Sequence, residues 1–377
     1  MFFTNFIISH SATAIYYGVI FALCLITAVY YSSGDDDRIY QSKNGLPISI
    51  ALLILFSLFW GSRPHDTYQF GDTWLYAYSY ENLFNNYMII DLNTEWLWNN
   101  LAYACRVMGL STTEYLIVIE ALYIGFAWGA CYRLTRNNVW MAFLFCVASM
   151  SFLAYGVNGI RNGLACSIVL FAISMLNKQE KKNYLYAALL LIAATGIHTS
   201  TFIPATALVL SVLLIKRTKT SIVIWLVSIV VSLVAGNSVI QLIPDFGLDM
   251  SRFDQYISMG EKSDVMQRFA NAGFRLDFLL YSAVPVLMVW YLTIKRNFND
   301  FTYNVIANTY ILANSFWIIV IRAAYTNRFA YLSWFLYPIV IVYPLARMKV
   351  WENQNQKVAW ILMAYVGFTV TMFLLGK

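Results

Sequence analysis

The sequence predicts an all-α protein, a polytopic transmembrane helical bundle of about twelve spans in one integral membrane domain, residues 1–377. Hydrophobic residues make up 60% of the chain and charged residues only 12%. Soluble domains carry about a quarter charged residues. Apolar runs of roughly 17–25 residues recur, each bounded by charges or by Gly, Pro or Asn, which is the pattern of membrane-spanning helices.

Successive apolar runs define the spans in chain order. They are predicted near 13–31, 46–60, 113–132, 138–156, 160–177, 183–197, 199–215, 221–236, 276–294, 304–321, 330–346 and 358–375. The first run follows no basic segment, so it is interpreted as a span and not as a cleaved signal. No connection is long enough or polar enough for a separate soluble domain.

Basic residues in the connections predict the topology. Alternate connections are short and carry Arg133/Arg136, Lys178/Lys181/Lys182, Lys216/Arg217/Lys219, Lys295/Arg296 and Arg347/Lys349. The positive-inside bias places them in the cytoplasm and both chain ends outside. The outer side then holds two long segments, at about 61–112 and 237–275. The net charge of +6 follows from this bias and does not indicate nucleic-acid binding.

The basic residues of the outer side are almost all arginine. They are Arg63, Arg106, Arg161, Arg252, Arg268, Arg275, Arg322 and Arg328, with Lys262 as the single lysine. Arginine is preferred where a planar fork must bind phosphate or carboxylate. About half of the set is expected to pair with aspartates of the same side, and the remainder predicts an anion-binding cavity.

The stretch from Gly156 to Phe202 predicts a polar site at one face of the membrane. Arg161 opens an apolar run that ends at Lys178–Lys182, and a second run of nearly equal length leads back to His198. At about 1.5 Å rise per residue each leg is about 24 Å long, so both residues are expected at the same depth. Ionisable residues in membrane spans are candidate functional residues, although a lone histidine can also be purely structural.

Three further features bear on function. Glu120, midway along the third predicted span, is either a hydrogen-bonding residue of the bundle or a functional one. The segment EWLWNNLAYACRVMGL predicts an interfacial amphipathic helix, with Trp96, Leu97, Leu101, Ala104 and Met108 on one face. Its aromatic residues could equally be headgroup anchors. The cysteines and histidines have neither the spacing of a disulfide framework nor that of a metal site.

Several short motifs resemble the EpsG-like branch of the Wzy-type polysaccharide (O-antigen, capsular or exopolysaccharide) polymerases. GIRNGLACSIVLFAISMLNK followed by HTSTFI is similar to the family's hairpin, in which an arginine opens a span and a histidine follows the return. Arg63, Gly71-Asp72-Thr73 and Tyr76 resemble its early outer motif. NRFAYLSWFLYPIVIVYP, with Arg328, resembles its late motif. The likeness covers about residues 60–345.

This resemblance implies a GT-C-like fold and a glycosyltransferase that uses no metal and no cofactor. Such enzymes transfer a growing glycan from undecaprenyl pyrophosphate to a new lipid-linked repeat unit. They act in the bacterial cytoplasmic (inner) membrane, with the active site facing the periplasm or exterior. The implied partners are the undecaprenyl-pyrophosphate-linked donor and acceptor glycans, membrane lipid, and a chain-length regulator and flippase, but no nucleic acid.

Residue roles follow from this chemistry. The departing lipid pyrophosphate carries about two to three negative charges, which arginines can stabilise where no DxD-like pair holds a metal. The predicted catalytic residues are His198, Asp72 and Arg161, with His198 or Asp72 as the base. The predicted substrate-binding residues are Arg63, Arg268, Arg275, Arg322, Arg328 and Tyr76. One outer cavity is expected, with the 237–275 segment closing over it.

Two alternatives stay open at this stage. An O-antigen-ligase-like transferase would bind the same donor, and the sequence does not separate it from a polymerase. A flippase or transporter for lipid-linked oligosaccharides would be expected to show two related halves with broken helices. No such internal symmetry is seen, and the arginines gather on one face, so an enzyme is favoured over a transporter.

Overall fold

The computed structural model describes residues 2–33, 45–65, 70–82, 95–242, 273–323 and 326–375, without the side chains of 2–9 and 237–242. All regular structure in these ranges is helical, which confirms the all-α prediction. The chain divides into two compact units, one of Met1–Thr201 with Ile341–Lys377 and one of Phe202–Val340, and each is described by itself.

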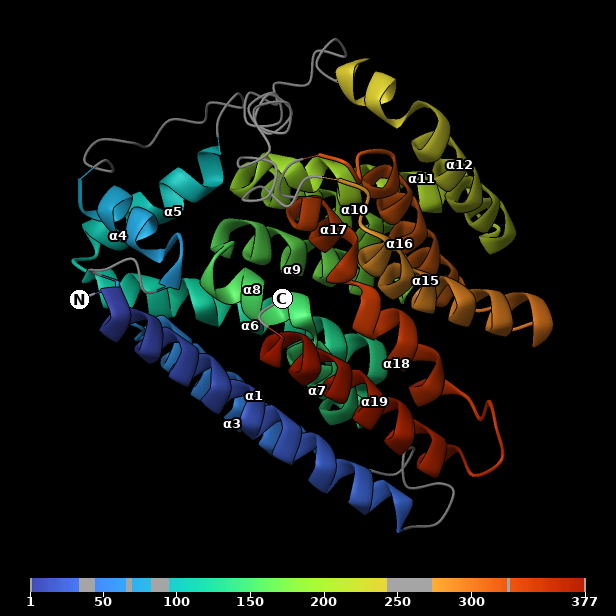
Figure 1. Ribbon diagram of the computed structural model, residues 1–377, viewed down its shortest axis with the longest axis horizontal. Coiled ribbons are helices and arrows are strands. Elements are labelled where there is room, and N and C mark those ends of the chain that lie inside the picture. The colour runs from blue at the N-terminus through green and yellow to red at the C-terminus, as the bar shows by residue number, and fades with distance from the viewer. Residues whose placement is uncertain are drawn as a thin grey trace. The chain divides into compact units, whose positions relative to one another are not determined.

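The first unit contains most of the helices drawn from blue to green in Figure 1, together with the last helix in red. Its helices are α1 (Phe2–Ser32), α3 (Gly45–Gly61), α4 (Thr73–Asn82), α5 (Trp96–Val107), α6 (Thr112–Thr135), α7 (Val139–Val147), α8 (Met150–Val157), α9 (Ile160–Met175), α10 (Lys181–Ile197) and α19 (Gln354–Leu374). The boundary between the units falls within α18 (Tyr337–Arg347).

In this unit α6 packs against α3 and α9, α9 packs against α10, and α1 packs against α19. Helix α7 is apolar on all sides, which predicts a buried helix, and every residue of it except Trp140 is buried. The Tyr16 hydroxyl of α1 donates a 2.7 Å hydrogen bond to the Val147 carbonyl at the end of α7. Helix α6 begins with a capping box, in which Ser111 and Glu114 satisfy each other's main-chain N–H groups.

The second unit consists of α11 (Phe202–Leu213), α12 (Thr218–Leu242), α15 (Leu276–Trp290) with a π-helical end, α16 (Phe301–Ile319) and α17 (Thr326–Trp334). Helix α16 packs against α11, α12 and α17. Fully buried Asn314 joins three partners: it accepts from Trp225 Nε1 at 2.8 Å and donates to Ser333 at 2.9 Å and Ser282 at 3.2 Å. Such interhelical hydrogen bonds suit helices that pack within a membrane.

Every predicted span contains a helix, but not every one of these helices is long enough to cross a membrane. Six helical stretches are long and apolar enough to cross a membrane: His10–Ser32, Thr112–Val147, Thr218–Gly236, Leu276–Lys295, Thr326–Arg347 and Gln354–Leu374. Shorter apolar helices occupy Gly45–Gly61, Ile160–Met175 and Thr199–Leu213. The count of about twelve spans and the GT-C-like fold therefore stay predictions.

Some boundaries differ from the sequence-based expectation. The run 138–156 is divided into α7 and α8, because the Ser149 side chain caps α8 by accepting from Phe152 N–H. Helix α12 continues to Leu242, so the first residues of the expected 237–275 outer segment are helical, and 243–272 lie outside the described residues. The other expected outer segment, 61–112, contains α4 and α5.

Candidate active site

The hairpin of α9 and α10 brings Arg161 and His198 to one place. Arg161 lies in the first turn of α9, and His198 is the C-cap of α10, with φ −152° and ψ 120°. Because the two helices pack against each other and have similar lengths, the start of one lies beside the end of the other. The extended backbone at His198 directs the chain out of the helix there.

Glu95 joins these two residues. Its Oε2 accepts a hydrogen bond from Nη1 of Arg161, and its Oε1 meets Nδ1 of His198. The three side chains are 14–18% exposed, so they are largely shielded and still reachable from solvent. Glu95 directly precedes α5, the amphipathic helix predicted from sequence. The sequence analysis missed it, although it is a carboxylate in an outer segment rich in arginine.

Tyr76 of α4 contacts Arg161 from another side. The guanidinium carbon of Arg161 lies 5.4 Å from the centroid of the Tyr76 ring, in cation–π range. Tyr76 itself is buried and meets Trp98 of α5 edge to face. Within the described part of the chain the buried Nε of Arg161 has no hydrogen-bond acceptor. The site therefore combines an oriented histidine, a bridging carboxylate and an arginine with spare donor capacity.

Arg63 and the Gly71-Asp72-Thr73 motif form a second polar cluster in the same unit. Arg63 is 3% exposed, and its Nη1 donates to Glu120 Oε1 at 2.7 Å. Its Nε donates to the Thr73 hydroxyl at 2.9 Å. Glu120 thus has the bundle hydrogen bond that was one of its two sequence-based interpretations. Whether Arg63 also contacts pyrophosphate stays a prediction.

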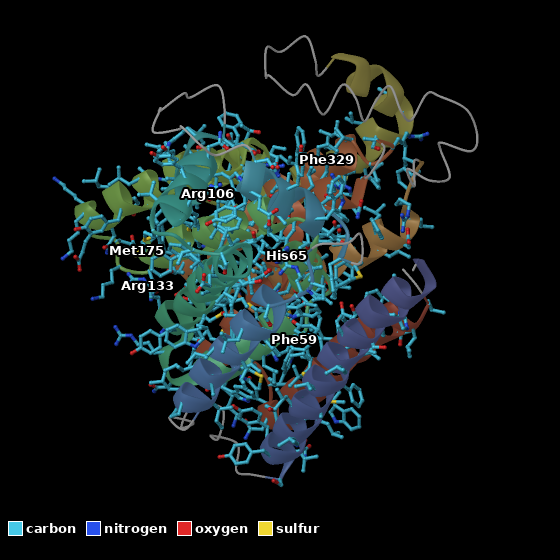
Figure 2. All side chains as sticks on the ribbon, turned by 90° about the vertical axis from the view of Figure 1, so that its left-hand side faces the viewer. Phe59, His65, Arg106, Arg133, Met175 and Phe329 are labelled. Atoms are coloured by element: carbon cyan, nitrogen blue, oxygen red, sulfur yellow. The ribbon has the colours of Figure 1, made fainter. Side chains whose placement is uncertain are left out.

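The end of α4 packs onto α5 and α6 through aromatic contacts. Tyr80 stacks on Tyr115 with ring centroids 4.1 Å apart, and Arg106 Nη1 donates to the Tyr80 carbonyl at 2.7 Å. Burial raises the pKa of Tyr80, so this phenol is a poor candidate for a base. His65 Nε2 lies 3.3 Å from the Thr113 hydroxyl in the first turn of α6. His65 and Arg106 are both labelled in Figure 2.

The face of α5 that packs on the protein consists of Trp98, Ala102 and Cys105. Ala104 and Met108, on the face predicted to be apolar and interfacial, are exposed. An amphipathic helix is therefore present, with its predicted apolar residues directed partly away from the protein.

The remaining predicted residues belong to the second unit or lie outside the described residues. Arg275 is paired with Asp277 through two hydrogen bonds of 2.9 and 2.7 Å, as expected for part of the arginine set. Arg322 lies 5.8 Å from the Phe274 ring centroid, and its buried Nε has no acceptor among the described residues. Arg328 is exposed, and Arg268 lies outside the described residues. One cavity shared with Arg161 stays a prediction.

The described ranges contain no group of three or more His, Cys, Asp or Glu side chains placed to hold a metal ion, and the metal-independent mechanism stays a prediction. The chemistry available at the Glu95 cluster is acid–base and electrostatic. A carboxylate at Nδ1 orients an imidazole and stabilises its protonated form. A guanidinium beside it can bind an anionic oxygen.

Fold and site together define an all-helical membrane protein whose polar site is assembled from helix ends and the segment before α5. The EpsG family model matches residues 46–376, and the chain belongs to this family. Membership points to a membrane protein of polysaccharide biosynthesis. No curated protein and no solved structure matches the chain.

Proposed function

We propose that the protein is a polysaccharide polymerase, a metal-independent membrane glycosyltransferase. It joins undecaprenyl-pyrophosphate-linked oligosaccharide repeat units on the extracytoplasmic face of the bacterial cytoplasmic membrane. The observation that supports this most is the Glu95 carboxylate, which contacts both Arg161 and His198. A flippase and a chain-length regulator are its expected partners, one supplying the repeat units and one setting how many are joined.

His198 acts as the base in this proposal. With Nδ1 held by Glu95, the imidazole keeps the tautomer in which Nε2 accepts a proton. The acceptor sugar hydroxyl gives its proton to Nε2, and its oxygen forms the new bond to the anomeric carbon of the donor glycan. The bond from that carbon to the pyrophosphate breaks, and undecaprenyl pyrophosphate leaves with the electron pair.

Arg161 stabilises the charge that develops on the departing pyrophosphate. Its guanidinium offers several N–H donors, of which Glu95 takes one through Nη1. Glu95 and the Tyr76 ring limit the orientations of the guanidinium, so it is preorganised before the reaction. Asp72 is the second candidate base, and it inherits the role if His198 is dispensable.

Glycan analysis in a deletion strain tests the proposal. Loss of the gene should leave glycans of a single repeat unit, and the wild-type gene should restore the ladder of longer chains. Long chains that accumulate unattached to their final acceptor would instead indicate a ligase. Unprocessed repeat units retained on the cytoplasmic side would indicate a flippase and would contradict the proposal.

A further inference from the structure

Thr73 lies at the centre of a buried polar connection between four helices. It is the first residue of α4 and is fully buried. Its hydroxyl accepts from Arg63 Nε at 2.9 Å and donates to the Val157 carbonyl at 3.0 Å. A hydroxyl has one proton to donate, so the contact to Val157 uses it. Val157 ends α8, where carbonyl groups lack helical partners.

Asn158 makes a second connection beside the first. Its side-chain Oδ1 accepts from the main-chain N–H of Asp72 at 2.8 Å. Gly71 makes this approach possible, since it has φ +55° and a Cβ there would lie 2.3 Å from Oδ1 of Asn158. The start of α4 is therefore attached at two adjacent points to the turn between α8 and α9.

Arg63 anchors this connection to the rest of the bundle. It follows α3, and its ion pair with Glu120 of α6 is buried on both sides. A buried charge is kept in place by its partner, because leaving it uncompensated in the protein interior is strongly unfavourable. We call Arg63, Thr73, Glu120 and Asn158, with the Val157 carbonyl, the polar joint.

The polar joint lies close in sequence to both partners of one contact in the candidate site. Tyr76 is one helical turn beyond Thr73 on α4, and Arg161 is three residues beyond Asn158 on α9. Arg161 and Tyr76 are in cation–π contact. Fixing the start of α4 to the start of α9 therefore fixes Tyr76 against the guanidinium.

We propose that the polar joint positions Arg161 for the pyrophosphate, and that Thr73 and Asn158 are positioning residues that act through Tyr76. This inference rests on the proposed function. It gives two residues of the Gly71-Asp72-Thr73 motif a structural role: Gly71 leaves space for the Asn158 side chain, and Thr73 supplies the central hydroxyl. Asp72 contributes its main-chain N–H to the joint, and any role of its carboxylate is separate.

Two substitutions of Thr73 separate the hydroxyl from the shape of the side chain. Thr73→Val is nearly isosteric but has no hydroxyl, whereas Thr73→Ser keeps it. The assay follows polymerisation of lipid-linked repeat units, extracted from the deletion strain, by the purified protein. Undecaprenyl pyrophosphate is added as an inhibitor, and its inhibition constant is measured for each variant. Thr73→Val should weaken its inhibition by roughly 10- to 100-fold, as displacement of a binding group does. Thr73→Ser should stay close to wild type.

A matched control and a double-mutant cycle exclude a general structural effect. Thr369→Val removes another buried hydroxyl, which donates to the Tyr365 carbonyl of the same helix α19, and should leave the inhibition unchanged. In a Tyr76→Leu background Thr73→Val should add little, because the joint acts through Tyr76. Equal losses in both backgrounds, or wild-type inhibition of folded Thr73→Val, would overturn the proposal.

Asn158 provides a second route if Thr73→Val fails to fold. It is exposed, so Asn158→Ala should fold, and it should weaken inhibition in the same way. Asn158→Asp keeps an acceptor oxygen and should rescue it. A wild-type inhibition constant of undecaprenyl pyrophosphate for Asn158→Ala would contradict the inference. Normal inhibition of Arg161→Lys by undecaprenyl pyrophosphate would also contradict the inference, because the joint would then position a residue that does not bind the pyrophosphate. The proposed function itself fails only if the deletion strain keeps its full ladder of chain lengths, which is a different result from failure of the joint alone.

Discussion

Glu95 connects two candidate catalytic side chains that come from different helices and meet at the open end of a hairpin. Its two carboxylate oxygens are divided between them, so the charge that orients the histidine also holds the arginine. Removal of that charge is therefore expected to affect both proton transfer and anion binding. This property separates Glu95 from a carboxylate with a local structural role, such as Glu114, which caps the start of its own helix α6.

Glu95→Gln should reduce polymer synthesis by roughly 10²–10⁴-fold, since the amide keeps the shape but loses the charge that fixes the imidazole. The measurement is glycan chain length after complementation of the deletion strain, with protein levels checked in membranes. Glu180→Gln is a matched control, because Glu180 forms an ion pair with exposed Lys182 at the start of α10. Full-length glycan from Glu95→Gln would remove Glu95 from the mechanism.

Arg161→Lys should strongly shorten the glycan at a normal protein level. Lysine keeps the positive charge but cannot contact Glu95, the Tyr76 ring and a phosphate oxygen with one planar group. Arg106→Lys provides the comparison, since Arg106 donates one hydrogen bond to a main-chain carbonyl and lysine can replace it there. Equal chain lengths in the two variants would mean that Arg161 is only an ion-pair residue.

At the scale of elements, the close approach of α10 to the start of α5 places Glu95 at the hairpin. Gly196 is buried in α10, and a Cβ on it would lie 2.7 Å from the Trp96 ring. Trp96 directly follows Glu95, so a displacement of the ring that shifts the start of α5 also moves the carboxylate. The packing of two helices thus decides the geometry of the site.

Gly196→Ala should therefore shorten the glycan, because the ring must move and carry Glu95 away from His198. Gly125→Ala is the control, since Gly125 also lies in a helix but a Cβ there meets nothing within 4 Å. It should be neutral or slightly stabilising, as alanine favours helices by about 0.5–1 kcal/mol. Normal chain length from Gly196→Ala would show that α5 tolerates the shift.

The buried pair of Arg63 and Glu120 predicts a stability effect. Glu120→Ala leaves the guanidinium without its counter-charge and should lower the free energy of unfolding by about 3–5 kcal/mol. The combined change Arg63→Met with Glu120→Leu removes both charges and should recover much of that loss. Thermal unfolding in detergent measures both. A double variant as unstable as Glu120→Ala would indicate that Arg63 stabilises the fold through its hydrogen bonds to the Thr73 hydroxyl and the Trp60 carbonyl instead.

At the scale of the whole molecule, the topology decides on which side of the membrane the site lies. Met108, at the end of α5, is 66% exposed, and Lys181 at the start of α10 is also exposed. The charge pattern predicts that the first lies outside and the second in the cytoplasm. All five natural cysteines are buried, so the background labelling of intact cells should be low.

Met108→Cys should react with a membrane-impermeant thiol reagent in intact cells, and Lys181→Cys should react only after the cells are opened. Both positions are exposed, so lack of labelling cannot be ascribed to burial. Labelling of Lys181→Cys in intact cells would reverse the arrangement and move the Glu95 cluster to the cytoplasmic side.

Much of the helical architecture could be predicted from sequence because its causes are local. Apolar runs, capping residues and basic turns act over a few residues, and they place helices at all twelve predicted stretches. They do not show where a run is interrupted. The division between α7 and α8 depends on whether Ser149 caps a new helix, which a continuous apolar pattern does not reveal.

The sequence by itself determined the helical class, the family motifs and the return of Arg161 and His198 to the same end of a hairpin. Only the tertiary structure decided that Glu95 lies between them, because it is separated from Arg161 by 66 positions and from His198 by 103. It also decided that Arg63 is buried against Glu120. Both results depend on which helix faces pack together, and no local spacing in the chain encodes that contact.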